Sequence, residues 1–328
     1  MAERVLVTGI SGYIGRHCAA ELLNQGFEVI GTVRSKAKAE STKTAISSAA
    51  PVDGLTFAEA DLLQDKGWDE AMSGCTYVLH VASPFVFAEP KDEAEMIKPA
   101  VEGTLRVVKA AQKAGVRRMV LTSSTFSMIA GKATGRYGPD SWSDAHGNIG
   151  AYAKSKTLAE KAAWDAAAGG EMELTVISPG AVYGPSLGTE VTGESLTFMR
   201  DIIGGKMPMV PNIAMGMVDV RDVARLHVAA MTADGAVGQR FIAATAEPIE
   251  MAYFAQVLRD AGYSKAPARK APNVAIKLMS VFDRQARGMI PFLGRKAAYD
   301  NHATFDILGW QPTPIETSIR EMAASISN

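Results

Sequence analysis

Three glycines near the start of the chain, Gly9, Gly12 and Gly15, place the strongest constraint on its fold. They follow the β-forming residues 4–8 in VLVTGISGYIGRH and lead into an apolar-periodic stretch at about 14–25. Because glycine has no Cβ, this spacing lets the backbone turn sharply after a strand and lets a ligand approach closely. Such a turn aims backbone N–H groups and the positive end of a helix at an anion. The loop therefore predicts a site for the pyrophosphate of a dinucleotide.

Short β-rich runs alternate with helical patterns through the first half of the chain. The runs are 4–8, 27–33, 55–60, 77–82, 118–123 and 174–178. The helical stretches lie at about 14–25, 36–48, 67–73, 92–114 and 150–168. Near-continuous apolar strands separated by helices imply a parallel sheet that is covered on both faces. The expected fold class is α/β, a doubly wound parallel sheet (Rossmann fold) with a smaller C-terminal substrate lobe.

The pattern changes after residue 180 into segments rich in Gly, Pro and Met. We expect residues 1–180 to form the cofactor domain, which also receives a strand and helix segment at about 216–245. The expected substrate-binding lobe consists of residues 181–215 and 246–328. Its predicted helical stretches are 250–261 and 272–288.

Charge and cysteine content exclude several classes of partner. The formal net charge of −1 gives no drive toward nucleic acid or an anionic membrane, so a small-molecule substrate fits better. Residues 4–8 leave no room for a signal peptide ahead of them, and no apolar run of about 18 residues predicts a membrane span. We therefore expect a cytoplasmic protein. Cys18 and Cys75 lack metal-ligand spacing, which predicts structural thiols and no metal site.

Arg34 stands at the position that selects the nucleotide. Sheets of this kind usually place an Asp or Glu there, about 20 residues beyond the glycines, to bind the ribose 2′-hydroxyl. A guanidinium suits a 2′-phosphate instead, so we expect NADP(H) bound by Arg34 with help from Lys38. The alternative is that both are ordinary surface cations at a helix start. Asp61 ends the third strand, where it can meet the adenine amine or serve as a helix N-cap.

Tyr152 and Lys156 lie four residues apart in AYAKSKTLAEKAA, hence on one face of a predicted helix. A phenol with its ordinary pKa of about 10 is a poor base at pH 7. A neighbouring ammonium stabilises the phenolate and brings its pKa toward the working range. The segment LTSST ends the fifth strand, in the crevice at the carboxyl ends of the strands where such folds bind ligands. These features together predict acid/base chemistry beside a dinucleotide.

At these motifs the sequence resembles the extended short-chain dehydrogenase/reductase family. TGISGYIG is similar to its glycine loop, Asp61-Leu62 to its adenine contact, LTSS to its serine strand and YAKSK to its YxxxK helix. Within that family, TVRS, HVASPF, WSD and MVDVRDVA resemble the branch of dihydroflavonol reductases and methylglyoxal or aldehyde reductases. The resemblance covers the chain to about residue 245. It implies an NADP-dependent oxidoreductase.

The resemblance also implies roles for individual residues. Ser124 would hydrogen-bond the substrate carbonyl, Tyr152 would exchange its proton, and Lys156 would lower the tyrosine pKa and hold the nicotinamide ribose. The implied cofactor contacts are Gly9, Ser11, Gly12, Tyr13, Ile14, Gly15, Arg34, Lys38, Asp61, Leu62, Val81, Ala82, Ser83, Thr122, Tyr152, Lys156, Pro179, Gly180 and Val182. The implied substrate contacts are Phe85, Phe126, Met128, Ile129 and Tyr183.

Alternatives stay open at several of these positions. Ser123 could be the working serine, and some of the apolar substrate contacts could pack in the core. Ala100 stands where the family often carries an Asn for a proton relay. Ile129 stands where plant dihydroflavonol reductases hold an Asn that recognises the flavonoid. These departures disfavour that relay and a flavonoid substrate.

The expected function is an NADPH-dependent carbonyl reductase or alcohol dehydrogenase that acts on hydrophobic ketones or aldehydes. One alternative is an NAD-dependent nucleotide-sugar epimerase on the same scaffold. The other is a non-catalytic NADP(H)-sensing protein, which would need neither the phenol nor the ammonium. The family often pairs its two long helices, here 92–114 and 150–168, so a homodimer is a further expectation.

Overall fold

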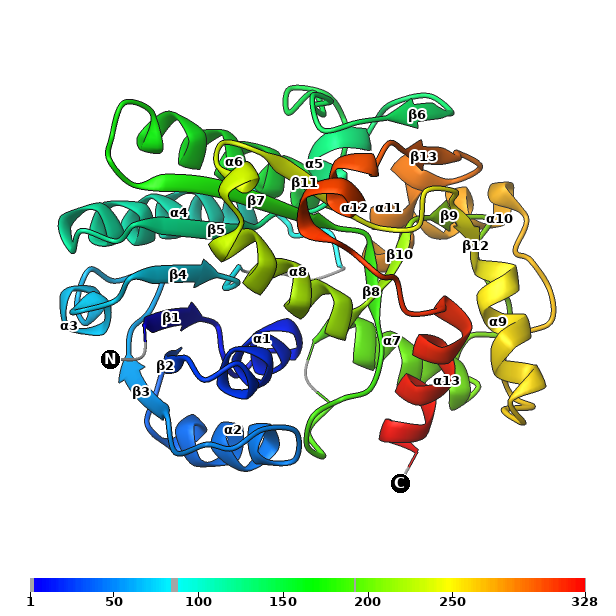
Figure 1. Ribbon diagram of the computed structural model, residues 1–328. Helices are drawn as coiled ribbons and strands as arrows, with labels where there is room; N and C mark the ends of the chain where they lie inside the picture. Colours follow the sequence, from blue (N-terminus) through cyan, green and yellow to red (C-terminus); the bar gives the residue numbers. More distant parts are fainter. Residues whose placement is uncertain (1–2, 84–87, 192, 328) are drawn as a thin grey trace.

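The computed structural model describes residues 3–83, 88–191 and 193–327, and a sheet of seven parallel strands forms the centre of these ranges (Figure 1). In spatial order the strands are β11 (Arg240–Ala243), β7 (Glu173–Pro179), β5 (Arg118–Thr122), β4 (Tyr77–His80), β1 (Arg4–Thr8), β2 (Glu28–Val33) and β3 (Leu55–Glu59). In the register, Val5 of β1 lies between Val29 and Tyr77. The strand order reverses beside β1, which is the doubly wound arrangement. The expected α/β fold is confirmed.

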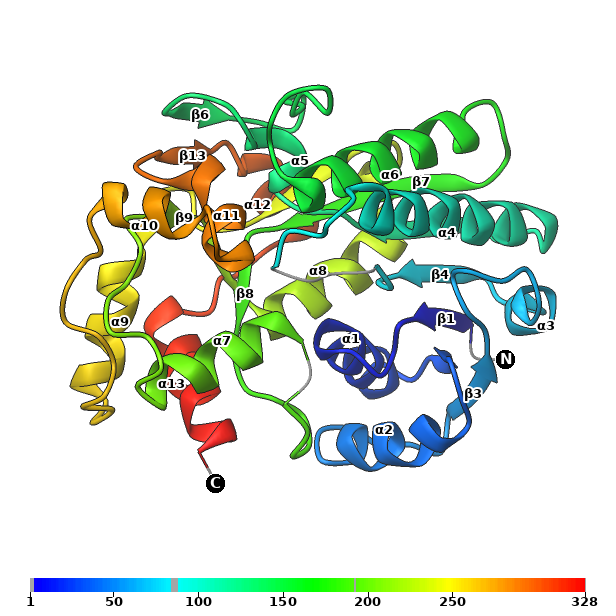
Figure 2. The ribbon, with the colours of Figure 1, turned by 180° about the vertical axis from the view of Figure 1, so that it is seen from behind.

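Helices cover both faces of the sheet. On one face lie α1 (Tyr13–Asn24), α2 (Ala37–Ser47) and α8 (Val220–Thr232). On the other lie α3 (Trp68–Met72), α4 (Ala94–Lys113) and α6 (Ala151–Ala167). Val5 and Val7 of β1 face the first group and Leu6 the second, because successive side chains of a strand point to opposite faces. Figure 2 shows α4 and α6 lying side by side, and their pairing into a homodimer stays a prediction.

A second apolar core lies beyond β7. There β8 (Ala181–Tyr183) pairs with β10 (Met217–Asp219), and α7 (Glu194–Ile203), α9 (Met251–Asp260) and α13 (Ile315–Ile326) pack together. Met199, Phe254 and Ile319 are fully buried between these elements. The remaining elements are α5 (Phe126–Ile129), β6 (Gly135–Tyr137), β9 (Ala214–Met215), η1 (Asp234–Ala236), β12 (Ile249–Glu250), α10 (Asn273–Met279), α11 (Arg284–Met289), η2 (Ile290–Phe292), β13 (Ala297–Tyr299) and α12 (His302–Leu308).

The structure corrects one predicted helix and refines another segment. The single helix expected over 272–288 is wrong, because α10 ends at Met279 and α11 begins only after Asp283. The Asp283 carboxylate accepts hydrogen bonds from the N–H groups of Gln285 and Ala286, which starts a new helix there. Of the strands in 216–245, β11 joins the large sheet and β10 does not. The division into two domains at residue 180 stays a prediction.

Across the described ranges, none of the helices has both the length and the apolar character that crossing a bilayer requires.

Candidate active site

The glycine turn joins β1 to α1 and lies against the chain that follows β4. Gly9 has a φ of +66°, and a Cβ on it would lie 2.9 Å from the Cα of Ala82. A Cβ on Gly15 would lie 2.3 Å from the Gly9 carbonyl oxygen. Both positions therefore need glycine. Helix α1 begins at Tyr13 without a side-chain cap from Gly12, so its end is suited to hold an anion.

The predicted adenosine contacts lie beyond the carboxyl ends of β2 and β3. Arg34 follows β2 as an exposed side chain, and Lys38 in the first turn of α2 pairs with Glu190 at 3.4 Å. Asp61 follows β3, and its Oδ1 accepts a hydrogen bond from the Leu63 N–H at 2.9 Å. This is a local turn, because the next helix, α3, begins further along the chain. Asp61 is therefore not a helix N-cap.

The remaining predicted cofactor contacts gather at the same edge of the sheet. Those at or just beyond the ends of β4, β5 and β7 are Val81, Ala82, Ser83, Thr122, Pro179, Gly180 and Val182. Ser11 belongs to the glycine turn, Ile14 lies in the first turn of α1, and Leu62 packs closely against Gly103 of α4. The Tyr13 hydroxyl donates to the Gly184 carbonyl at 2.6 Å, so this side chain links the turn to the segment after β8.

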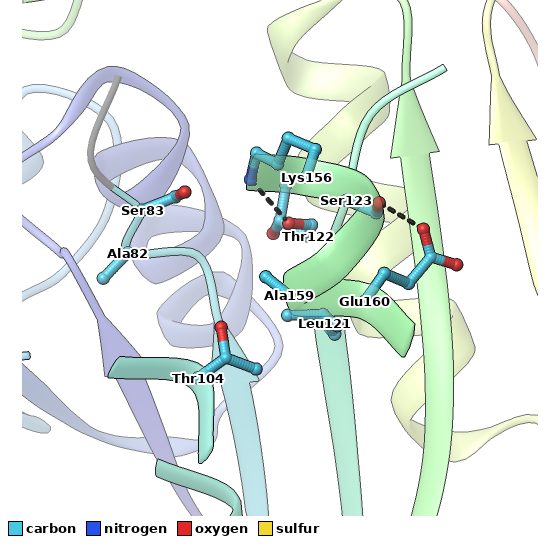
Figure 3. Close-up of a pocket in the computed structure, with 9 residues that line it drawn as sticks. All are labelled: Ala82, Ser83, Thr104, Leu121, Thr122, Ser123, Lys156, Ala159 and Glu160. Carbon is cyan, nitrogen blue, oxygen red and sulfur yellow. Dashed lines mark hydrogen bonds between the residues drawn. The ribbon is translucent and has the colours of Figure 1, made fainter. Parts of the chain in front are cut away.

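Ser124, Tyr152 and Lys156 come together beyond the end of β5. Ser124 follows that strand, and the other two residues lie on the first turns of α6. A hydrogen bond joins the Ser124 and Tyr152 side chains. The buried Lys156 donates from Nζ to the Thr122 carbonyl at 3.1 Å (Figure 3). The Glu89 carboxylate accepts from the Ala151 N–H at 2.8 Å and so holds the start of this helix.

Burial decides the protonation of this cluster. It raises the pKa of Tyr152 to about 12, although the hydrogen bond with Ser124 opposes the rise. Burial also lowers the pKa of Lys156 to about 8, and the Glu160 carboxylate opposes that change. The expected lowering of the Tyr152 pKa toward the working range is not found here, because desolvation of the phenolate is the larger effect. A phenol in this state is protonated at pH 7 and can donate a proton.

Ser123 is held in a different network from Ser124. Its hydroxyl donates to Glu160 Oε2 at 2.5 Å, and Ser127 donates to the same oxygen at 2.8 Å. Arg240 of β11 donates from Nε to Glu160 Oε1 at 2.5 Å. The structure therefore engages the Ser123 hydroxyl with a buried carboxylate and brings Ser124, not Ser123, to Tyr152.

Arg240 fastens this network to the loop before α6. Its Nη1 donates to the Pro139 and Ser141 carbonyls, and its guanidinium lies 3.8 Å from the ring centroid of Trp142. The sequence motifs did not predict roles for Glu160 and Arg240. The signal for Glu160 was present, because it follows Lys156 by four residues and so shares its helix face. Arg240 is 80 residues away from Glu160 and had no local signal.

Lys156 and Glu160 both line one small pocket, shown in Figure 3. The cavity measures about 10 Å³, roughly the room that one water molecule needs. Its other polar side chains are Ser83, Thr104, Thr122 and Ser123. The Lys156 ammonium and the Glu160 carboxylate thus belong to the lining of one small pocket with mostly polar side chains.

The predicted substrate contacts separate into two groups. Phe126 lies beside Tyr152, with the two rings edge to face at 5.9 Å, and its other side stacks on Phe292 at 4.3 Å. Met128 is fully buried in a core cluster with Ile242, Ala244 and Tyr299, against which Ile129 packs. Tyr183 packs on Phe254 in the second core. Phe85 lies outside the described residues. Of the predicted residues described, the structure therefore brings Phe126 next to Tyr152 and buries Met128 elsewhere.

Phe292 was not predicted, because nothing near it in the sequence carries a motif. Phe292 lies in η2, far from Phe126 in the sequence, and stacks on the Phe126 ring.

Over the ranges that the structure describes, His, Cys, Asp and Glu side chains form no group of three or more that could hold a metal ion.

Residues 5–244 match the model of the NAD dependent epimerase/dehydratase family. This range includes the glycine turn, the strand that precedes Ser124 and the helix that carries Tyr152. The chain belongs to this family. The resemblance drawn from its motifs is thereby confirmed. Members of the epimerase/dehydratase family bind a nicotinamide dinucleotide, for which the glycine turn described above is suited.

Three known proteins illustrate what this chain is similar to. Dihydroflavonol 4-reductase of Hordeum vulgare is 37% identical over 210 residues, which are 62% of this chain and 59% of that protein. The match thus spans less than two thirds of that relative. Cinnamoyl-CoA reductase CAD2 of Medicago truncatula is 30% identical over 98% of this chain and 95% of that protein. Yeast methylglyoxal/isovaleraldehyde reductase Gre2, solved with NADPH, shares the fold at a TM-score of 0.82, with 24% identity and 98% of each chain covered.

Proposed function

We propose that this chain is an NADPH-dependent carbonyl reductase that acts on hydrophobic ketones or aldehydes. The observation that carries the proposal is the cluster of Ser124, Tyr152 and Lys156 at the carboxyl edge of the sheet, beside the glycine turn. Relatives named as reductases of carbonyl compounds support it, and one of them was solved with NADPH. A substrate would lie against the Phe126 and Phe292 rings.

The chemistry follows from the protonation of the cluster. The cofactor, when bound, supplies the hydride for the carbonyl carbon. Tyr152, protonated at neutral pH, gives its proton to the carbonyl oxygen, while Ser124 donates a hydrogen bond to the same oxygen. The Lys156 ammonium adds positive charge behind the phenol. The Phe126 and Phe292 rings favour an alkyl or aryl group, because burying apolar area yields about 25 cal/mol per Å².

Arg34→Asp is expected to raise the KM for NADPH about 10- to 100-fold and to leave the KM for NADH unchanged or lower. A charged hydrogen bond to the 2′-phosphate contributes about 1.5–3 kcal/mol, and the new carboxylate would repel that phosphate. Steady-state kinetics with both cofactors measure the effect. Lys43→Gln on the same helix α2 is the control. Equal kcat/KM for NADPH and NADH in the unaltered protein would contradict the cofactor assignment.

Carbonyl reduction is expected to fall as the pH rises through about 8. Burial lowers the pKa of Lys156 to about 8, so its ammonium is present below this pH and is lost above it. Tyr152, with a pKa of about 12, keeps its proton throughout this range. A profile of kcat/KM against pH, recorded between about pH 6 and 10, measures this fall as its descending limb. A profile that stays flat to pH 10 would remove the ammonium from the mechanism.

A substrate panel decides between the proposal and its alternatives. Aryl ketones, short aldehydes, dihydroflavonols and nucleotide sugars are assayed with NADPH and NADH, and kcat/KM is compared. Hydrophobic ketones or aldehydes are expected to give the highest values, because an apolar wall leaves sugar hydroxyls unpaired at about 1–3 kcal/mol each. Activity confined to nucleotide sugars, with tightly retained NAD, would favour the epimerase. NADPH consumption with any carbonyl compound excludes a purely sensing protein.

A further inference from the structure

Residues 184–190, which follow β8, are hydrogen-bonded to α1 and paired with α2, the two helices beside the proposed nucleotide site. Helix α1 contributes three side chains: Tyr13 donates to the Gly184 carbonyl, His17 to the Pro185 carbonyl at 2.9 Å, and Arg16 to the Leu187 carbonyl at 2.8 Å. Residues 184–190 therefore lie along α1 and reach α2, as the ribbon shows (Figures 1 and 2).

The segment then runs along α2 toward its first turn. Gly188, at a φ of +80°, is so close to this helix that a Cβ on it would lie 2.8 Å from the Ala45 Cβ. Two residues later, Glu190 reaches Lys38 in the first turn of α2. The segment after β8 thus places a carboxylate at the start of α2, the helix that follows Arg34.

Glu190 bridges two cations of different character. Its Oε2 lies 2.9 Å from Arg16 Nη2, and its Oε1 lies 3.4 Å from Lys38 Nζ. The Arg16 side chain is only 3% exposed and also holds Leu187, so it is fixed in place. Lys38 is 55% exposed and its contact is long, so it can turn to another anion at little cost.

We propose that Glu190 is a specificity-determining residue that weakens the binding of a 2′-phosphate relative to a 2′-hydroxyl. The inference rests on the proposed function, which assigns the 2′-phosphate to Arg34 and Lys38. Glu190 pairs with Lys38 and places a negative charge between Lys38 and Arg16. A 2′-phosphate must take Lys38 from Glu190 and bear the repulsion of the carboxylate that Arg16 keeps nearby.

The expected effect is electrostatic and of moderate size. Two charges separated by several ångströms at a hydrated surface, one of them a phosphate with nearly two charges, change affinity about three- to tenfold at low salt. The effect should shrink at about 1 M salt, where the screening length falls to about 3 Å. Glu190→Gln keeps an oxygen that accepts from Arg16, so it removes the charge without removing that hydrogen bond.

Calorimetric titration of the full chain with adenosine 2′,5′-bisphosphate and with adenosine 5′-monophosphate tests the inference, because the two probes differ only in the 2′-phosphate. Glu190→Gln is expected to lower the Kd of the bisphosphate about three- to tenfold and to change that of the monophosphate less than about twofold. Glu40→Gln removes the same charge two residues from Lys38 in the first turn of α2 and is the control. In a Lys38→Gln background the effect of Glu190→Gln should diminish.

The inference is overturned if Glu190→Gln leaves the ratio of the two Kd values unchanged, or if Glu40→Gln shifts the ratio equally. Should Glu190→Gln not fold, Glu190→Asp withdraws the charge by one methylene and is expected to act in the same direction, more weakly. The proposed function is judged separately, from the ratio in the unaltered protein. A chain that prefers the monophosphate contradicts the NADPH assignment, whereas the change caused by Glu190→Gln still tests Glu190.

Discussion

Tyr152→Phe is expected to lower kcat for carbonyl reduction by about 10²- to 10⁴-fold, which is the usual contribution of a positioned general acid. The substitution removes the hydroxyl that hydrogen-bonds with Ser124. It keeps the ring that packs edge to face on Phe126, so the fold and the neighbouring apolar wall should persist. Cofactor binding, measured by fluorescence titration with NADPH, is expected to change little. The substitution should therefore lower kcat without weakening the binding of NADPH.

Tyr137→Phe is the matched control for this experiment. The Tyr137 hydroxyl donates to the Ala133 carbonyl at 2.9 Å on β6, away from the Ser124 cluster. Its loss should leave kcat within about twofold, because it removes one surface hydrogen bond of about 1 kcal/mol. Near-native kcat in Tyr152→Phe would instead show that another group supplies the proton, and the assignment of the phenol would be wrong.

Arg240→Met is expected to destabilise the fold by about 3–5 kcal/mol, since it leaves a buried carboxylate without its cation. The Glu160 side chain is 1% exposed, and that of Arg240 is 8% exposed. The substitution also removes the hydrogen bonds to Pro139 and Ser141 and the contact with Trp142. Urea unfolding measures the loss as a lower midpoint at similar slope.

An exposed ion pair in the same protein is the control. Arg136 and Glu247 have side chains 52% and 72% exposed, so Glu247→Gln should cost about 0–1 kcal/mol. The double variant Glu160→Leu/Arg240→Met should recover part of the stability lost in Arg240→Met, because neither charge remains buried. A loss below about 1 kcal/mol in Arg240→Met would mean that water or another cation reaches Glu160.

Glu160→Gln links this network to the chemistry. The Glu160 carboxylate raises the pKa of Lys156 against the effect of burial. Its neutralisation should therefore move the limb of the reduction profile to a pH below that of the unaltered protein. A variant that loses stability without moving the limb would show that the carboxylate supports the fold alone.

Short-range sequence patterns predicted much of this molecule. The spacing of Gly9, Gly12 and Gly15 reflects a turn in which missing Cβ atoms are required, and the structure has that turn. Tyr152 and Lys156 share a helix face because four residues make about one turn. The prediction of one helix over 272–288 was wrong, because the Asp283 side chain caps the start of a second helix within this apolar pattern.

Predictions for the individual site residues were less complete than those for the fold. The sequence left Ser123 and Ser124 undecided, because adjacent residues after a strand carry no local signal for which neighbour each will meet. The Ser123 hydroxyl donates to Glu160, which Arg240 holds in place, whereas the Ser124 side chain meets Tyr152. Met128, predicted beside the substrate, is fully buried because tertiary packing turned it into the core.

The sequence by itself determined the parallel sheet, the glycine turn and the spacing of the phenol and the ammonium, since each depends on residues within about one strand or one helix turn of each other. Only the tertiary structure decided the stacking of Phe126 on Phe292, the pairing of Glu160 with Arg240 and the reach of Glu190 to Lys38. These partners lie 80 or more residues apart for the two ion pairs. Their contacts arise when strand order and burial bring distant segments together, and no local periodicity encodes them.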